Sequence, residues 1–263
     1  MFEVTRYEGR RRMRGTAVLT VLLAVYALLI VFLYPSIAES SVDFDEYVES
    51  LPPAFQEGFV GSANFSTVEG FLSIEMYQFL WLLLLGLYVA YSGGALVAGD
   101  VETGQLDMLL ATPISRSRVV VEKYLSLLVP VLGVNLVTPF VVYVGLLAID
   151  ETIDPVSLFA LHLLSIPYLL MCAGVGLLLS VRMDRADIAQ RGGIGAVFGL
   201  FLLDTVSTDT DFEWLGALSP TRYFSPVDIL SEGTYDVAGA LLLLAGAIAC
   251  VGVSVLLFER RDI

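Results

Sequence analysis

The chain contains very little lysine, histidine or cysteine. Its 263 residues include one lysine, Lys123, one histidine, His162, and two cysteines, Cys172 and Cys250. A phosphate-binding loop needs a lysine preceded by glycines in the pattern G-x-x-x-x-G-K-[ST], whereas Lys123 follows three valines and a glutamate. We therefore expect no ATP, magnesium or other cofactor to be bound by this chain itself.

The same shortage removes the usual enzyme and metal sites. His162 has no Cys, Asp or Glu at ligand spacing, and neither H-E-x-x-H nor G-x-S-x-G occurs. Cys172 and Cys250 fall inside apolar runs, where free cysteines behave as small buried hydrophobic residues rather than as a disulfide framework. The sequence therefore predicts a protein with no catalytic residues and no metal ligands.

Positive charge is also scarce. The chain has 14 Lys and Arg against 28 Asp and Glu, for a formal net charge of −14. Nucleic-acid binding needs clustered cations, so this balance argues against it. The hydrophobic fraction of 57% exceeds the norm of about 45–50% apolar residues in soluble domains. The mean hydropathy of +0.80 is also on the apolar side. No polar stretch is long enough for a separate soluble domain, which predicts one integral membrane domain over 1–263.

Long apolar runs are what the sequence does contain. A helix of about 20 apolar residues crosses the hydrocarbon core of a bilayer. Six runs are candidates for such helices, at 16–34, 76–98, 124–149, 156–181, 192–206 and 237–258. The fifth is the weakest, because it is short and interrupted by Asp204. We expect an all-α membrane protein built as a bundle of six transmembrane helices.

The basic residues predict how these helices are oriented. Thirteen of the 14 lie before the first run, between the second and third, between the fourth and fifth, or after the sixth. The alternate segments 35–75, 150–155 and 207–236 hold only Arg222. Because Lys and Arg are retained on the cytoplasmic side, both termini are expected to be cytoplasmic in a multi-pass protein of the cytoplasmic membrane. The first run exceeds the roughly 7–15 residues of a signal-peptide core and should be retained.

The three outer segments are acidic and hold 17 of the 28 Asp and Glu residues. Such an exterior suits either a high-salt organism or a cation-attracting surface, and its even spread favours the first. In the outer loop 35–75, apolar residues between Phe44 and Phe55 recur every three or four positions. This spacing predicts an amphipathic helix that lies on the membrane or caps the bundle, with a substrate gate as the alternative.

The segment between the second and third runs predicts a short helix across the inner membrane face, at 102–112. Leu106, Leu109 and Leu110 form an apolar stripe on it. Pro113 ends it, and either Ser115 or Ser117 can cap the helix that re-enters the membrane. This pattern fits a docking element for another protein or an ordinary interfacial connector.

This segment resembles one from a known family. The pattern Glu102-x-Gly104-x-Leu106-x-x-Leu109-Leu110-x-Thr112-Pro113-x-Ser115-Arg116, followed by Lys123, is similar to the permease subunits of type-2 ATP-binding-cassette transporters. The resemblance extends to the six-span layout, to Ser219-Pro220-x-Arg222-Tyr223-Phe224 and to the closing Phe258-x-Arg260-Arg261-Asp262. With its acidic outer loops, the chain looks like a haloarchaeal member.

The resemblance implies a role for segment 102–112 as the coupling helix that docks into a separate ATPase subunit, which binds ATP and Mg. The docking residues that it implies are Glu102, Gly104, Leu106, Leu109, Leu110, Thr112, Pro113 and Arg116. It also implies a second permease copy or a paralogue as partner. Export as the direction of transport follows from the resemblance alone.

Polar groups within the spans are candidates for a substrate path. Asn135 lies between two prolines that we expect to kink the third span, and Asp204 lies near the outer end of the fifth. For Asp204 the alternative is that the helix simply ends early, with 212–218 as an interfacial piece. Gly195 and Gly199 form a G-x-x-x-G patch that allows close helix packing, either within the chain or across a dimer.

These observations predict the permease subunit of an ATP-driven transporter, which moves an unidentified substrate across the cytoplasmic membrane and uses a separate ATPase subunit. The alternatives are a stand-alone secondary transporter or channel, and a membrane enzyme or assembly scaffold. A secondary transporter would be expected to show paired ionisable residues at mid-membrane or inverted repeats, and neither is evident.

Overall fold

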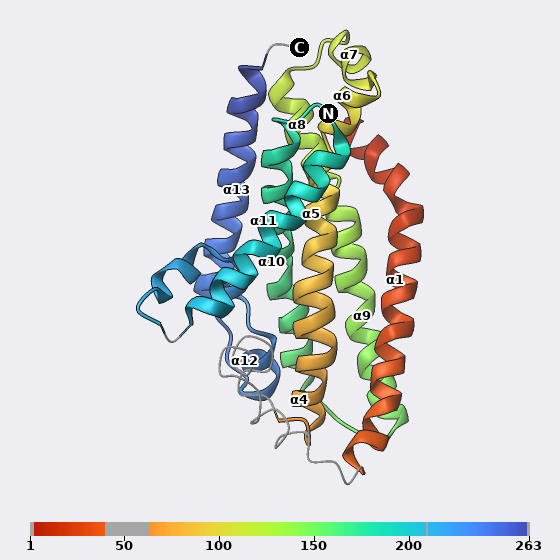
Figure 1. Ribbon diagram of the computed structural model, residues 1–263. Helices are drawn as coiled ribbons and strands as arrows, with labels where there is room; N and C mark the ends of the chain where they lie inside the picture. The colour runs from red at the N-terminus through yellow and green to blue at the C-terminus, as the bar shows by residue number, and fades with distance from the viewer. Residues whose placement is uncertain (1–2, 40–63, 209, 262–263) are drawn as a thin grey trace.

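The computed structural model describes residues 3–39, 64–208 and 210–261, and throughout these ranges the secondary structure is helical, without strands (Figure 1). Six helices or helix series are long and apolar enough to cross a membrane. The predicted all-α bundle is therefore confirmed. The amphipathic helix predicted between Phe44 and Phe55 lies outside the described residues.

The first three spans differ in regularity. The first is one helix, α1 (Glu3–Ala38), and the second joins α4 (Val68–Leu72), a π-helical stretch η2 (Ser73–Leu85) and α5 (Gly86–Gly94). Two short helices, α6 (Ala98–Glu102) and α7 (Gln105–Leu110), precede the third span, which is divided into α8 (Arg116–Leu125) and α9 (Leu128–Ala148).

The last three spans are regular helices. They are α10 (Pro155–Ser180), α11 (Ala186–Ser207) and α13 (Val237–Glu259). Between α11 and α13 the chain forms two 3₁₀ helices, η3 (Glu213–Leu218) and η4 (Pro220–Tyr223), and the short helix α12 (Pro226–Ser231).

Some helix limits differ from the apolar runs. The basic residues before the first run are part of α1, so this helix continues well beyond the apolar stretch. The fifth helix begins at Ala186 rather than near Gly192, and its 22 residues are enough to span. The second span ends at Gly94, and Ala98 already belongs to the next helix.

The kink expected from Pro130 and Pro139 takes a specific form. The third span breaks between Leu125 and Leu128, one turn before Pro130. Pro130 has no N–H to donate to the carbonyl of Ser126, so the regular hydrogen-bond ladder cannot continue there. Pro139 lies inside α9 without dividing it.

The helix α10 occupies the centre of the bundle and packs against α5, α9, α11 and α13, while α1 packs along α9 at one edge (Figure 1). Glycines permit the closest contact, because a Cβ atom on Gly93 would lie 2.3 Å from the carbonyl oxygen of Ala173, and one on Gly176 would lie 2.1 Å from that of Ala90. Trp81, Tyr77 and Tyr168 are the largest fully buried side chains of the core.

Both ends of the described chain lie at the same end of the bundle as α6 and α7 (Figure 1). We call this the basic end, and define it by the start of α1, by α6, α7 and α8, and by the end of α13. The opposite end holds α4 and α12 and is called the acidic end.

Candidate functional site

The segment predicted as one coupling helix is divided into α6 and α7. Gly104 between them has a φ of 68°, a left-handed conformation that glycine adopts without strain and that interrupts the helix predicted over 102–112. After α7, the cap of α8 is Ser115 rather than Ser117, because the Ser115 side chain accepts a hydrogen bond from the Arg118 N–H at 3.3 Å.

The apolar stripe of this segment faces its own bundle. Leu106 is 1% exposed and belongs to the core, and Leu109 and Leu110 are half-buried against it. Met108, by contrast, is 68% exposed. The surface that a partner protein can reach is therefore the face around Met108, with the exposed residues Gln105, Asp107, Ala111, Thr112 and Pro113.

Two of the predicted docking residues bond within the chain on either side of the segment. The Glu102 carboxylate accepts a hydrogen bond from the backbone N–H of Ala186 at 2.9 Å, which places negative charge at the N-terminus of α11. Arg116 donates to the backbone carbonyl of Arg261 at 2.5 Å, and its guanidinium carbon lies 5.9 Å from the centre of the Phe258 ring. The segment is thus connected to α11 and to the end of α13.

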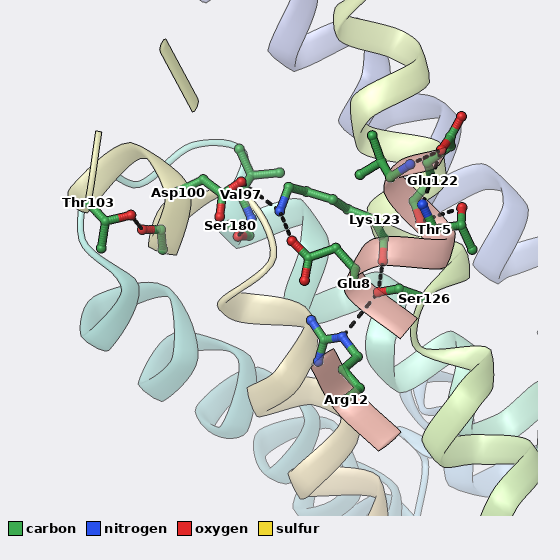
Figure 2. Close-up of polar contacts among 12 residues, drawn as sticks. Thr5, Glu8, Arg12, Val97, Asp100, Thr103, Glu122, Lys123, Ser126 and Ser180 are labelled. Atoms are coloured by element: carbon green, nitrogen blue, oxygen red, sulfur yellow. Dashed lines mark hydrogen bonds and ion pairs between the residues drawn. The ribbon is translucent and has the colours of Figure 1, made fainter. Parts of the chain in front are cut away.

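A buried ion cluster links α6 to α1 (Figure 2). The Lys123 ammonium lies 2.6 Å from Asp100 Oδ2 on α6 and 3.0 Å from Glu8 Oε1 on α1. The Lys123 side chain is 3% exposed, and those of Glu8 and Asp100 are 12% and 15% exposed. The only lysine of the chain therefore joins three helices, because α8 carries it between the other two.

The residue before Lys123 holds the start of α1 (Figure 2). Glu122 Oε2 accepts hydrogen bonds from the N–H groups of Val4 at 2.8 Å and Thr5 at 3.1 Å, and Glu122 Oε1 lies 2.6 Å from Arg118 Nε. Two turns further along α1, Arg12 donates to the Ser126 hydroxyl at 3.1 Å. These bonds satisfy N–H groups that the first turn of a helix leaves free and fix α1 against α8.

The start of α6 is fixed by α10. The Ser180 hydroxyl oxygen accepts hydrogen bonds from the N–H groups of Val97 at 2.9 Å and Ala98 at 3.0 Å.

Between α7 and the start of α1 lies an open pocket of about 970 Å³, whose lining includes Met108, Leu109 and Lys123. The basic end therefore combines a firmly held ion cluster with an exposed, partly apolar surface beside a pocket.

Asn135, predicted as a candidate for the substrate path, lies in a buried network between three spans. Its Oδ1 accepts from the Ser165 hydroxyl at 2.8 Å and lies 3.2 Å from His162 Nδ1, while His162 Nε2 lies 3.2 Å from the Tyr77 hydroxyl. Because the Asn135 oxygen is an acceptor, His162 carries its proton on Nδ1 and accepts from Tyr77 on Nε2. Trp81 donates to Ser165 at 3.1 Å and completes the network.

Asp204 lies in a separate cluster, where α11 meets the two 3₁₀ helices. Its Oδ2 accepts from the Thr221 hydroxyl at 2.8 Å, and its Oδ1 lies 3.9 Å from Arg222 Nη1. Arg222 also donates to the backbone carbonyl of Glu213 at 2.8 Å. The single basic residue predicted on the outer side thus holds η3 and η4 against the end of α11, together with Asp204.

Gly195 and Gly199 face away from the bundle. A Cβ atom added at either position would meet nothing within 4 Å. A glycine of α11 that does pack closely within the chain is Gly193, where a Cβ atom would lie 3.0 Å from the Ala90 carbonyl oxygen. Within the described chain, the Gly195–Gly199 face is therefore unused for helix packing.

Sequence reasoning missed the partners of Lys123. Glu8 is an acidic residue within a strongly basic stretch, and Asp100 follows the second apolar run, so both stood out by charge. However, nothing in the sequence indicates that the side chains of Glu8 and Asp100 meet that of Lys123. Among the described residues, no group of three or more His, Cys, Asp or Glu side chains could hold a metal ion.

Comparison with known proteins identifies the family of the chain. No curated protein matches the chain. The family model described as "ABC-2 family transporter protein" matches residues 6–263, which is nearly the whole chain. It covers the basic end, all six spans and the cluster around Asp204. The chain therefore belongs to the ABC-2 transporter family, whose members are membrane components of ATP-binding-cassette transporters.

Proposed function

We propose that this chain is the permease subunit of an exporter in the cytoplasmic membrane, and that it is driven by a separate ATPase subunit that binds ATP and Mg. The observation that supports the proposal most directly is the exposed face of α7 around Met108. This face lies at the basic end and is backed by Leu106 in the core and by the Lys123 cluster.

The contacts of the basic end suggest how a push on this face would travel. Movement of α6 and α7 would act on α1 through Asp100, Lys123 and Glu8, and on α11 through the bond from Ala186 to Glu102. Packed helices transmit such displacements as rigid bodies. ATP-driven closure of the ATPase would therefore rock α1 and α11 and switch the bundle between inward-open and outward-open forms.

The basic end is the proposed cytoplasmic side. Thirteen of the 14 basic residues precede, connect or follow the spans on that side, and Lys and Arg are retained on the cytoplasmic face of membrane proteins. This orientation brings α7 to the side where ATP is available.

A second permease, either a copy or a paralogue, is the proposed neighbour of α11. Gly195 and Gly199 leave a flat strip on the outer surface of this helix, beside the exposed side chains of Phe198 and Leu202. Small residues allow helix backbones to approach closely in a bilayer, where dispersion contacts drive association.

The experiment that tests the proposal is co-purification of the chain with its ATPase subunit from the native organism. Met108→Asp introduces a charge into the proposed docking contact, and an uncompensated buried charge costs about 3–5 kcal/mol. Because about 1.4 kcal/mol corresponds to a factor of ten, we expect recovery of the ATPase to fall at least tenfold.

The control is Thr152→Asp, which makes the same charge change at an exposed position on the acidic end and should leave recovery unchanged. Leu109 is less suitable as a test position, because its side chain is half-buried against the bundle and a charge there would disturb the chain itself. Equal recovery of an ATPase with Met108→Asp and with the unmodified chain would contradict docking at α7.

A further inference from the structure

The start of α1 carries four exposed arginines within two turns: Arg6, Arg10, Arg11 and Arg14. Among the described residues, none of the four makes an ion pair. Arg12, the fifth arginine of this stretch, points inward and donates to Ser126. The exposed arginines therefore do not serve the internal ion cluster.

Arg10 and Arg14 are in phase with the most exposed face of α1, whereas Arg11 lines the pocket between α7 and the start of α1. Steps of four and three residues lead from Arg10 through Arg14 and Val18 to Val21. The same steps continue through Val25, Leu29 and Phe32, all of them more than half exposed. Residues at such spacings share one side of an α-helix. The arginines thus extend an apolar stripe that the rest of the bundle leaves uncovered.

Helix geometry gives the depth of the arginines in a bilayer. The uncharged stretch from Gly15 to Tyr34 contains 20 residues. At about 1.5 Å per residue it matches a hydrocarbon core of about 30 Å, so Arg14 lies at its boundary. Arg10 lies about 6 Å further out, which is the depth of the headgroup layer on one side of the membrane.

We propose that Arg10 and Arg14 form a binding surface for the headgroups of anionic phospholipids on the lipid-facing side of α1. The apolar stripe of the same helix contacts the acyl chains, and the guanidinium groups meet the phosphates as bidentate donors. The inference needs only that α1 spans a bilayer and does not depend on the ATPase.

The test uses the full-length chain reconstituted in vesicles with equal amounts of phosphatidylcholine and phosphatidylglycerol. After mild solubilisation, the lipids retained by the protein are measured by mass spectrometry. Each arginine near an anionic surface contributes about a fivefold gain in lipid affinity. We expect enrichment of phosphatidylglycerol with the unmodified chain, and a severalfold decrease with R10Q/R14Q.

The matched control, R182Q/R185Q, removes the same charge from the exposed turn between α10 and α11 and should retain the enrichment. R10K/R14K keeps the charge and should retain most of the phosphatidylglycerol enrichment. This result would show that R10Q/R14Q acts through lost charge and not through misfolding. Three results would overturn the proposal: no enrichment with the unmodified chain, an equal decrease with R182Q/R185Q, or unchanged enrichment with R10Q/R14Q. In the last case, loss of a co-purifying ATPase would assign the arginines to a protein contact instead.

Discussion

Asp100 and Glu8 lie on different helices and share one counterion, Lys123, at 2.6 Å and 3.0 Å. Removing the shared cation leaves two largely buried carboxylates side by side. Unlike a surface ion pair, such a cluster is strongly destabilised when one partner is lost. The ion cluster therefore provides the first prediction.

Lys123→Met should lower the free energy of unfolding by about 3–5 kcal/mol, because it leaves buried charge without compensation. Thermal or denaturant unfolding in detergent measures the change. The control Arg185→Gln breaks an exposed ion pair with Asp187 and should cost at most about 1 kcal/mol. The triple variant K123M/E8Q/D100N removes the charges together and should recover much of the loss. If Lys123→Met is as stable as the control variant, Lys123 does not stabilise the protein through Glu8 and Asp100.

Asn135→Leu should destabilise the bundle by about 1–3 kcal/mol, because it removes the acceptor for Ser165 and for the His162 Nδ1 proton. Unfolding in detergent again provides the measurement. Thr138→Val is the control on the same helix, since the buried Thr138 hydroxyl has no hydrogen-bond partner among the described residues. It should be close to neutral, and a loss as large as that of Asn135→Leu would argue against a role for the network.

Asp204→Ala should loosen the segment from η3 to η4, because Thr221 loses its acceptor and Arg222 loses a counterion. We expect hydrogen exchange of the backbone amides in 213–223 to accelerate about tenfold, the equivalent of one lost hydrogen bond. Asp211→Ala, at an exposed position nearby, serves as the control. If Asp204 lines a substrate path instead, the variant should reduce transport while exchange in this segment stays unchanged.

The orientation of the chain can be tested with single cysteines and an impermeant thiol reagent. Thr152→Cys and Thr210→Cys, both at exposed positions of the acidic end, should react from outside intact cells. Ser117→Cys at the basic end should react only after the membrane is opened. The unmodified chain, with Cys172 and Cys250, measures the background. Reaction of Ser117→Cys in intact cells would reverse the proposed topology.

The sequence predicted the fold class well, because crossing a bilayer demands long apolar helices that composition alone reveals. It was less informative about helix limits, since polar and charged residues such as Arg10 or Asp187 continue a helix as well as apolar ones do. The division of the predicted coupling helix depends on a single left-handed residue, Gly104, and glycine is also tolerated within helices.

The sequence predicted helical structure in the segment between the second and third spans, but not the contacts of that segment. A stripe of Leu106, Leu109 and Leu110 on an inner segment looks the same whether it faces a partner protein or its own bundle, and packing alone decides between them. The partners of Lys123 and Asn135 come from distant parts of the sequence. Such pairings depend on the tertiary arrangement, which periodicity does not encode.

The start of α1 and the segment after α13 are held by the same ten-residue helix. Glu122 binds the first turn of α1, and Arg116 binds the carbonyl of Arg261 near the end of the chain. The two anchor residues are about 9 Å apart along α8, so the first turn of α1 and the segment after α13 are joined through one short helix. A change in either segment therefore acts on the helix that carries Lys123, and reporters for binding experiments are better placed in the exposed turn at Thr152.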